Sequence, residues 1–257
     1  MNIRDNVHKL VYAFQRQTRQ YSITSKGKKV EIIKYHDGTR EVRYNGVVYS
    51  RISPNSILTH SYWDYFLPLA YAYENARVLM IGLGGGTIAY QLEKALAPIS
   101  KFDIVEVDQD MINLARLFYP DMRANIIKGD GLEYIKDKRG QYDMIILDAY
   151  INYSIPAAFI SKAFIDDACA ALSSNGILAI NYLQDANGAQ ASRAFIEMLK
   201  ASFNVYTLAT KATLYNTIIL ASKSLDGESI YRKVSAGMPK EYAESDLMRS
   251  YLNIKKA

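Results

Sequence analysis

The sequence predicts an α/β protein with a mostly parallel, seven-stranded sheet covered by helices and a small antiparallel β-hairpin domain in front of it. From residue 76 onward, continuous apolar runs such as VLMIGLG and YDMIILDAY alternate with amphipathic stretches of helical spacing. Strands that are apolar along their whole length are typical of parallel sheets buried on both faces. Residues 21–52 are instead rich in β-branched and aromatic side chains and contain Asp37-Gly38 and Asn45-Gly46, dipeptides that favour hairpin turns.

These changes in pattern divide the chain into three parts. Residues 1–55 form the predicted domain of a short N-terminal helix and β-hairpins, residues 56–225 the main domain, and residues 226–257 a polar, partly helical tail. We expect residues 56–76 to form a mostly buried helix, in which Pro68 introduces a kink or starts a second helix. The last two strands, NVYTLAT and YNTIILAS, have no helix between them and should therefore run antiparallel at the sheet edge.

Composition indicates an ordinary globular protein. The chain has 257 residues, 49% of them hydrophobic, with no apolar run of the roughly 18 to 20 residues that span a membrane and no apolar segment of a secretory signal at its start. We therefore expect a cytoplasmic location. The single cysteine, Cys169, has apolar neighbours and is interpreted as core filler, and His8, His36 and His60 lack metal-ligand spacing, so no metal is expected.

The formal charge of +5 is concentrated near the N-terminus. Residues 1–60 carry 11 Lys and Arg against 4 Asp and Glu, whereas the remainder carries 20 against 22. A basic segment of this kind can meet nucleic acid, but lysines that protect the edge of a β-ribbon give the same composition. We favour the second interpretation.

The strongest functional signal is a glycine-rich turn between a buried strand and a helix. Gly82, Gly84, Gly85 and Gly86 follow VLMI directly, and they allow a sharp backbone turn close to a ligand beside a helix N-terminus. About 20 residues further on, Glu106 ends the next strand, where a carboxylate can accept hydrogen bonds from both ribose hydroxyls. Dinucleotide-binding domains share both features, so these two elements alone indicate a nucleoside site of either kind.

Two further aspartates extend this pattern to the following strands. Asp130, followed by Gly131, comes directly after the third strand, where a carboxylate can accept a hydrogen bond from the adenine amino group. Asp148 ends the fourth strand, and ligands of open α/β sheets lie against such strand ends. A carboxylate there can orient or deprotonate an attacking amine, so Asp148 and the nearby Tyr150 are the candidate catalytic residues.

Taken together, VLMIGLGGGT, IVEVD, IIKGDGLEYI and YDMIILDAY resemble spermidine synthases and their relatives, the polyamine aminopropyltransferases. The likeness covers roughly residues 28–222 and implies a Rossmann-like domain of the class I S-adenosylmethionine-dependent methyltransferase type after a small hairpin domain. It implies that the glycine loop and the residues matching Glu106 and Asp130 hold decarboxylated S-adenosylmethionine or its thioether product. The residue matching Asp148 then helps to activate the attacking amine. Asp108, which closes IVEVD, joins the nucleoside-binding candidates.

The sequence departs from the family on the acceptor side. Gly85 stands where the family usually has an aspartate that engages the amino group of the donor, and Ala149-Tyr150-Ile151-Asn152 replaces a Ser-Ser/Thr-Asp-Pro segment. The family's hairpin-turn glutamine is Tyr49 here, and its tyrosine-glutamate pair has no clean counterpart. The expected wall residues of the acceptor side are Tyr49, His60, Tyr62, Tyr150 and Tyr153.

Three functions remain open from the sequence. The first is aminopropyl transfer from decarboxylated S-adenosylmethionine to a small-molecule amine, and the second is methylation with S-adenosylmethionine itself. The third is a non-catalytic nucleoside-binding module that uses the basic N-terminal domain to contact RNA. The family resemblance also implies a homodimer or a higher homo-oligomer, and no membrane partner is expected.

Overall fold

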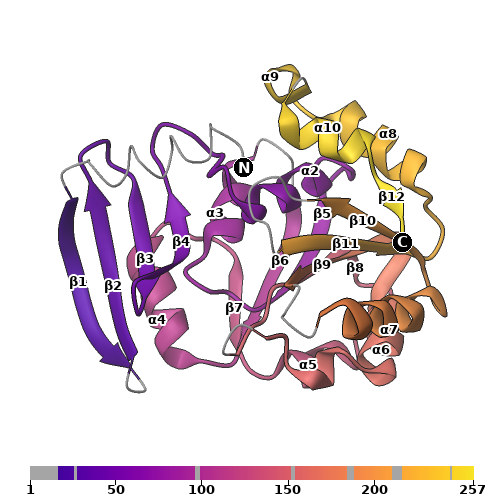
Figure 1. The fold of residues 1–257 in the computed structure, drawn as a ribbon, viewed down its shortest axis with the longest axis horizontal. Coiled ribbons are helices and arrows are strands. Elements are labelled where there is room, and N and C mark those ends of the chain that lie inside the picture. Colours follow the sequence, from indigo (N-terminus) through magenta and orange to yellow (C-terminus); the bar gives the residue numbers. More distant parts are fainter. Residues whose placement is uncertain are drawn as a thin grey trace.

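The computed structural model describes residues 17–25, 28–95, 99–151, 154–183, 188–209, 216–243 and 245–257. Two sheets dominate these residues: a four-stranded sheet, β1–β4, and an eight-stranded main sheet that lies beside it (Figure 1). The fold is therefore the predicted α/β architecture with a small antiparallel sheet before the main domain.

The N-terminal sheet is built from successive hairpins. Its strands are β1 (Gln17–Ser25), β2 (Lys28–Tyr35), β3 (Arg40–Tyr44) and β4 (Val47–Ile52), and each pairs antiparallel with the next. Gly38, Asn45 and Gly46 have φ angles of 84°, 48° and 81°, so the turns at both predicted dipeptides use left-handed conformations. These two predictions are confirmed, whereas the predicted N-terminal helix lies largely in residues 1–16, outside the described residues.

The main sheet has the strand order β12-β10-β11-β9-β8-β5-β6-β7. Its strands are β5 (Ala76–Ile81), β6 (Ile99–Glu106), β7 (Asn125–Lys128), β8 (Tyr142–Leu147), β9 (Leu172–Leu183), β10 (Asn204–Ala209), β11 (Asn216–Ser222) and β12 (Lys255–Lys256). The five strands from β5 to β9 pair in parallel, while β10 and β11 pair antiparallel as predicted. β11 is also antiparallel to β9. The two-residue β12 adds an eighth strand that the sequence pattern is too short to show.

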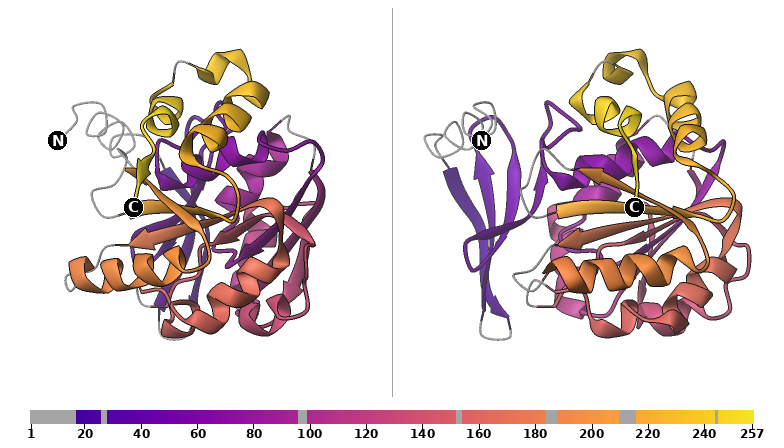
Figure 2. Two further views of the ribbon diagram at one scale, coloured as in Figure 1. Left: turned by 90° about the vertical axis from the view of Figure 1, so that its right-hand side faces the viewer. Right: turned by 45° about the vertical axis from the view of Figure 1, so that its right-hand side comes forward.

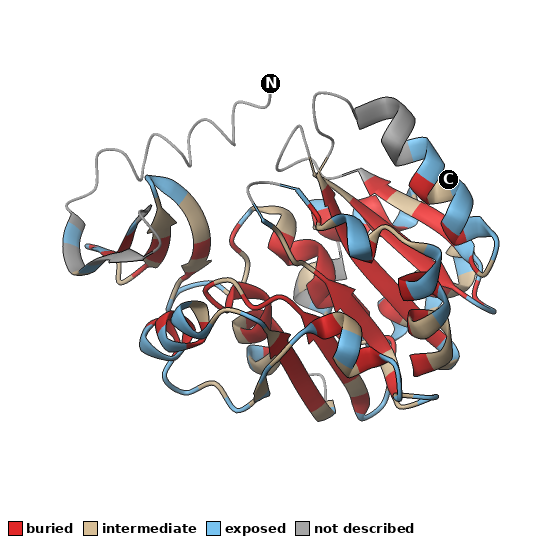
Figure 3. Ribbon diagram, turned by 90° about the horizontal axis from the view of Figure 1, so that it is seen from below, coloured by how far each residue is buried: buried red, intermediate tan, exposed pale blue. Residues whose placement is uncertain are grey.

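Helices cover both faces of the main sheet (Figure 2). Buried side chains of α5 (Gly131–Ile135), α6 (Lys162–Ala171) and α7 (Gly188–Lys200) pack on one face. The other face is covered by α2 (Leu67–Ala70), α3 (Thr87–Lys94), α8 (Gly227–Gly237) and α10 (Asp246–Leu252). Two further short elements are the 3₁₀ helix η2 (Ala157–Phe159) and α9 (Lys240–Ala243). The central strands are consequently buried along most of their length (Figure 3).

Residues 56–76 do not form the long helix predicted from their apolar pattern. They contain an irregular segment, the 3₁₀ helix η1 (Tyr62–Phe66) and α2, in which Pro68 lies in the first turn. The buried Asp64 carboxylate accepts hydrogen bonds from the amide N–H groups of Thr59 and His60 and from the Thr59 hydroxyl. These amides therefore bond to a side chain instead of a helical carbonyl, which explains why the helix begins later.

The helix α4 (Gln109–Phe118) joins the two sheets. Its Ile112 and Ala115 belong to the core of the main domain, while Leu114 and Phe118 pack with buried residues of the N-terminal sheet. A second link is polar, because the Thr87 hydroxyl accepts a hydrogen bond from the Arg51 amide at 2.8 Å. The start of α3, and with it the glycine-rich turn, is thus fixed against β4.

The C-terminal tail, residues 226–257, contains the helices α8, α9 and α10, and it contributes to the core of the main domain. Ile230, Val234, Met248 and Tyr251 are at most 3% exposed. The Tyr251 hydroxyl also donates a hydrogen bond of 2.5 Å to the carbonyl of Tyr65. Among the described residues, no helix is long and apolar enough to cross a membrane.

This packing predicts that the tail and the main domain unfold together. Replacing the buried Met248 by alanine should lower the free energy of unfolding by about 2 to 5 kcal/mol, because it leaves a cavity in the core. Leu252→Ala, at a residue that is 60% exposed on the same helix, should change it by less than about 0.5 kcal/mol. Urea unfolding followed by circular dichroism measures both values, and equal effects of the two substitutions would contradict this account of the tail.

Candidate functional site

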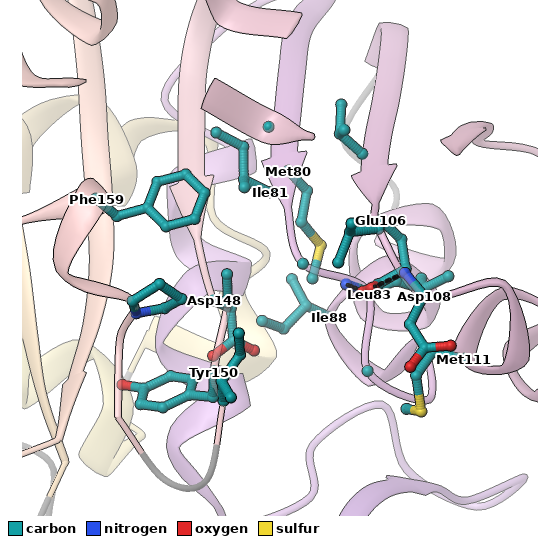
Figure 4. Close-up of a pocket in the computed structure, with 18 of the residues that line it drawn as sticks. Met80, Ile81, Leu83, Ile88, Glu106, Asp108, Met111, Asp148, Tyr150 and Phe159 are labelled. Carbon is teal, nitrogen blue, oxygen red and sulfur yellow. Dashed lines mark hydrogen bonds between the residues drawn. The ribbon is translucent and has the colours of Figure 1, made fainter. Parts of the chain in front are cut away.

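A cavity of about 780 Å³ opens at the carboxyl ends of the central parallel strands. Figure 4 shows Glu106 and Asp108 at one side of it and Asp148 and Tyr150 at the other, with Met80 and Ile88 between them. This volume is within the range of roughly 300 to 1,000 Å³ that is usual for small-molecule sites. The N-terminal sheet contributes Tyr44, Tyr49 and Ser50 to the wall, so the cavity lies where the two sheets meet.

The glycine-rich turn after β5 forms part of the cavity wall. Gly82 and Gly84 line it, with φ angles of 92° and 53°. A Cβ at Gly82 would lie 2.4 Å from the carbonyl oxygen of Asp148, so this glycine lets the turn pass directly against the end of β8. Gly84, by contrast, has only the Tyr49 carbonyl near its missing Cβ, at 3.8 Å, and leaves its surroundings open.

The other two glycines of the turn do not line the cavity. A Cβ at Gly85 would lie 2.5 Å from both the Cβ and the Oγ of Ser50, and a Cβ at Gly86 would lie 2.7 Å from Cε of Met122. Gly85 therefore needs glycine for packing against β4, whereas Gly86 needs it because its φ angle is 92°. Both glycines were predicted to bind the ligand with Gly82 and Gly84, but neither is among the residues that line the cavity.

Glu106 fixes two backbone segments of the nucleoside side. Its Oε2 accepts a hydrogen bond from the Leu83 amide at 2.9 Å, and its Oε1 accepts one from the Asp108 amide at 2.8 Å (Figure 4). Each carboxylate oxygen has a second lone pair, so both oxygens can still accept a hydrogen bond from a ligand. Asp108 lines the same wall and caps α4, where its Oδ1 accepts a hydrogen bond from the Asp110 amide.

Asp130 and Gly131 lie on the same side, at the turn from β7 to α5, and both line the cavity. The Asp130 Oδ1 caps α5 by accepting a hydrogen bond from the Leu132 amide at 2.8 Å. A Cβ at Gly131 would lie 2.5 Å from Cγ2 of Ile81, so glycine permits the close approach of this turn to β5. The capping role of Asp130 uses Oδ1, so its Oδ2 can still accept a hydrogen bond from a ligand.

Asp148, at the end of β8, is the carboxylate of the opposite side. Burial raises its pKa to about 6, while hydrogen bonds from Asn181 and Tyr62 oppose that shift by favouring the charged form. The Asn181 Nδ2 donates to the Asp148 Oδ1 at 2.8 Å. Burial raises the pKa of Tyr62 well above its usual value, so this hydroxyl stays protonated and remains a donor. Asp148 can therefore change its protonation state near neutral pH.

Two polar residues behind Asp148, namely Asn181 and Asn216, were not predicted from the sequence. Asn181 of β9 is only 1% exposed, and its Oδ1 accepts a hydrogen bond from the Asn216 Nδ2 at 2.8 Å. The Tyr150 hydroxyl donates to the Asn181 carbonyl at 2.5 Å. The signal available in the sequence was the single asparagine within the apolar run GILAINYL, since a buried amide requires hydrogen-bond partners. Nothing in the sequence around Asn216 indicates its contact.

Aromatic side chains surround Asp148. Of the predicted wall residues, Tyr49, Tyr62 and Tyr150 line the cavity, whereas His60 is exposed and lies outside the lining, and Tyr153 is outside the described residues. Two aromatic contacts extend this wall, with ring centroids 5.2 Å apart for Tyr44 and Tyr49 and 4.9 Å apart for Tyr62 and Trp63. Further lining residues that the sequence did not reveal are Trp63, Met111, Pro156 and Phe159.

Within the described ranges, no cluster of three or more His, Cys, Asp or Glu side chains has the arrangement of a metal site. Cys169 forms no disulfide. It lies on α6, and its partly buried side chain packs against the core on that face of the main sheet, which agrees with the predicted packing role.

The model of the spermine/spermidine synthase domain matches residues 65–225 of this chain. That match covers more than half of the chain and includes the glycine turn, Glu106, Asp130 and Asp148. The protein belongs to the spermine/spermidine synthase family.

Curated relatives agree with this assignment. The polyamine aminopropyltransferase of Vibrio vulnificus is 39% identical over 111 residues, which are 41% of this chain and 37% of the relative. That of Neisseria meningitidis serogroup B is 32% identical over 152 residues, or 57% of this chain and 56% of the relative. The chain thus matches between about a third and somewhat more than half of the length of these two proteins.

Solved structures show the same fold. A spermidine synthase in complex with the transition-state analogue AdoDATO is similar with a TM-score of 0.64 and 18% identity, over 89% of this chain and 79% of that one. Human methyltransferase-like protein 13 in complex with SAH is similar with a TM-score of 0.56 and 22% identity, over 72% and 97% of the two chains. The class of fold is therefore Rossmann-like and of the methyltransferase type, as predicted.

The raised pKa of Asp148 predicts a stability cost that depends on pH. Because the folded-state pKa of about 6 lies above the usual aspartate value of about 3.9, folding favours the protonated form, and this contribution is lost as the pH rises through 6. Asp148→Asn should therefore raise the free energy of unfolding at about pH 8 by on the order of 1 to 3 kcal/mol, and this gain should shrink toward about pH 4. Urea unfolding of both proteins across this range measures the difference, and a gain that is independent of pH would contradict the assignment.

Proposed function

We propose that this protein is an aminopropyltransferase that binds a nucleoside sulfonium of the S-adenosylmethionine type in this cavity and transfers its aminopropyl group to an amine. The observation that carries the proposal is the convergence of the glycine turn, Glu106, Asp130 and Asp148 on one cavity. These residues end four adjacent parallel strands, which is where ligands of open α/β sheets bind. Membership of the spermine/spermidine synthase family supports the same reaction class.

The nucleoside end of the ligand fits the side of Glu106 and Asp130. The ribose hydroxyls would donate to the remaining lone pairs of Glu106, and the adenine amino group would donate to Asp130. Met80, Ile88 and Leu132 add apolar surface to the cavity wall. The backbone at Gly84, which no neighbouring side chain approaches, gives the sulfonium side chain room to pass along the glycine turn toward Asp148.

At the other end, Asp148 would prepare the amine for attack. A protonated amine loses one proton to Asp148, and its free lone pair forms a C–N bond to the methylene carbon attached to the sulfonium sulfur. The C–S bond breaks, its electron pair stays on sulfur, and a neutral thioether leaves. Burial raises the pKa of Asp148, so it accepts this proton more readily than an exposed carboxylate does. Burial also lowers the pKa of an ammonium group, so a buried amine releases its proton more readily than one in water.

Methylation with carboxylated S-adenosylmethionine is a second candidate, and the surroundings of Gly85 favour it. A side chain at this position would collide with Ser50. The turn therefore has no room for the donor-binding aspartate that spermidine synthases usually have here. An SAH-bound methyltransferase-like protein also shares the fold. In this alternative the same nucleoside contacts would hold the donor, and only the transferred group would differ.

Product analysis with both donors tests the proposed function. Incubation with decarboxylated S-adenosylmethionine and a set of amines should yield methylthioadenosine and an aminopropylated amine. Asp148→Asn should lower kcat at least about 100-fold while changing the affinity for methylthioadenosine by less than about 10-fold, since the lost group acts on the nucleophile. Asp166→Asn, the same substitution on the exposed surface of α6, should leave both quantities unchanged.

The outcomes separate the candidates. Turnover only with carboxylated S-adenosylmethionine would replace the proposal by methylation, and calorimetric silence toward both donors and methylthioadenosine would rule out both enzymatic functions. An unchanged kcat in Asp148→Asn would assign that carboxylate a structural role.

The role of Glu106 can be tested by binding alone. Glu106→Ala should weaken methylthioadenosine binding by about 1 to 3 kcal/mol, because the ribose hydroxyls lose a charged acceptor and the Leu83 amide loses its partner. Glu133→Ala, on the exposed side of α5, serves as the matched control. Isothermal titration calorimetry gives both dissociation constants, and equal affinities would contradict the ribose assignment.

A further inference from the structure

Behind Asp148 a chain of amide hydrogen bonds crosses three neighbouring strands. The Asn216 Nδ2 on β11 donates to the Asn181 Oδ1 on β9, and the Asn181 Nδ2 donates to the Asp148 Oδ1 after β8, each at 2.8 Å. The strand register produces this alignment. Asn181 pairs with Ile218, and Asn216 lies two residues before Ile218, so both amides point to the same face of the sheet.

The direction of these hydrogen bonds fixes the orientation of the Asn181 amide. An ionised carboxylate only accepts hydrogen bonds, so the NH₂ group of Asn181 has to face Asp148 and its oxygen has to face away. The donor from Asn216 meets that oxygen and stabilises this one of the two possible orientations. With the amide reversed, two oxygens would face each other at Asp148 and Asn181, which is unfavourable in a buried site.

The backbone of Asn181 is also held. The Tyr150 hydroxyl donates to the Asn181 carbonyl, and burial raises the pKa of Tyr150, so this donor stays protonated. Tyr62 of η1 also favours the ionised form of Asp148, against the larger effect of burial. The neutral Asn181 amide thus holds one oxygen of Asp148, and among the described residues no ion pair compensates its charge.

We propose that Asn181 and Asn216 are positioning residues of the transferase, in which Asn216 orients the Asn181 amide so that it holds Asp148 in the ionised form and in one rotamer. The inference rests on the proposed function for its consequence in turnover. The coupling of Asn216 to Asp148 through Asn181 does not depend on which group the enzyme transfers. Neither asparagine lines the cavity, so both act through Asp148.

Three substitutions test the coupling in the full-length chain: Asn181→Leu, Asn216→Leu and the double variant. Each single variant should lower kcat about 10- to 100-fold, with the affinity for methylthioadenosine within a factor of about 3. Loss of a donor to the charged form raises the pKa of Asp148, so the acidic limb of the kcat/KM profile should move to higher pH. Because Asn216 acts through Asn181, the double variant should be no slower than Asn181→Leu alone.

Asn125→Leu is the matched control, because it also removes an amide-to-carboxylate hydrogen bond, from Asn125 to Asp103, away from the cavity. It should leave the acidic limb where it is. Additive effects in the double variant, or an unmoved acidic limb in both single variants, would overturn the proposal. If Asn181→Leu does not fold, Asn216→Leu still tests the proposal, because it leaves the buried Asn181 amide in place. The position of the acidic limb of its kcat/KM profile then gives the answer.

A second measurement separates this proposal from the proposed function. Carbon-13 NMR of labelled aspartate carboxyls, with the Asp148→Asn variant for assignment, follows the titration of Asp148 without any substrate. Asn216→Leu should raise its titration midpoint even if the chain transfers no aminopropyl group. An unshifted midpoint would refute the coupling, whereas a shifted midpoint in a protein without turnover would refute only the proposed function.

Discussion

Asp148 is a partly buried carboxylate at the end of β8, and among the described residues its side-chain hydrogen bond comes from the neutral Asn181 amide. A charge in such a place is unfavourable for folding unless a ligand compensates it. Stability is given up in this way mainly where function requires it. We propose that a cationic amine binds beside Asp148. Its positive charge would compensate the carboxylate, and transfer of its proton to Asp148 would free the amine lone pair for attack.

The same cavity depends on how tightly the N-terminal sheet closes on the glycine turn. Ser50 of β4 lies where a side chain at residue 85 would have to be, and the Arg51 amide is bonded to Thr87 at the start of α3. Through these contacts the small sheet forms a wall of the site and contributes Tyr44 and Tyr49 to it. Close packing of the N-terminal sheet on the glycine turn therefore requires glycine at residue 85.

The fold was predictable because its signals are local and repeated. Each local pattern predicts one element: an apolar run predicts a strand, the dipeptides at Asp37 and Asn45 predict turns, and the glycine run predicts a strand-to-helix turn. The order of these elements along the chain then predicts the sheet. The segment around Thr59 was not predictable, because the buried Asp64 captures backbone donors that its apolar pattern would assign to a helix. In the site, strand ends located Glu106, Asp130 and Asp148, whereas the pairing of Asn181 with Asn216 depends on strand register, which motifs do not encode.

We propose that the nucleoside and the amine bind in one cavity, with Glu106 and Asp130 at one end and Asp148 at the other. A crystal structure of the protein soaked with methylthioadenosine tests it most directly. The account predicts adenine at Asp130, ribose hydroxyls at Glu106 and the sulfur atom directed toward Asp148. Methylthioadenosine bound elsewhere, or bound in this cavity with its sulfur pointing away from Asp148, would contradict it.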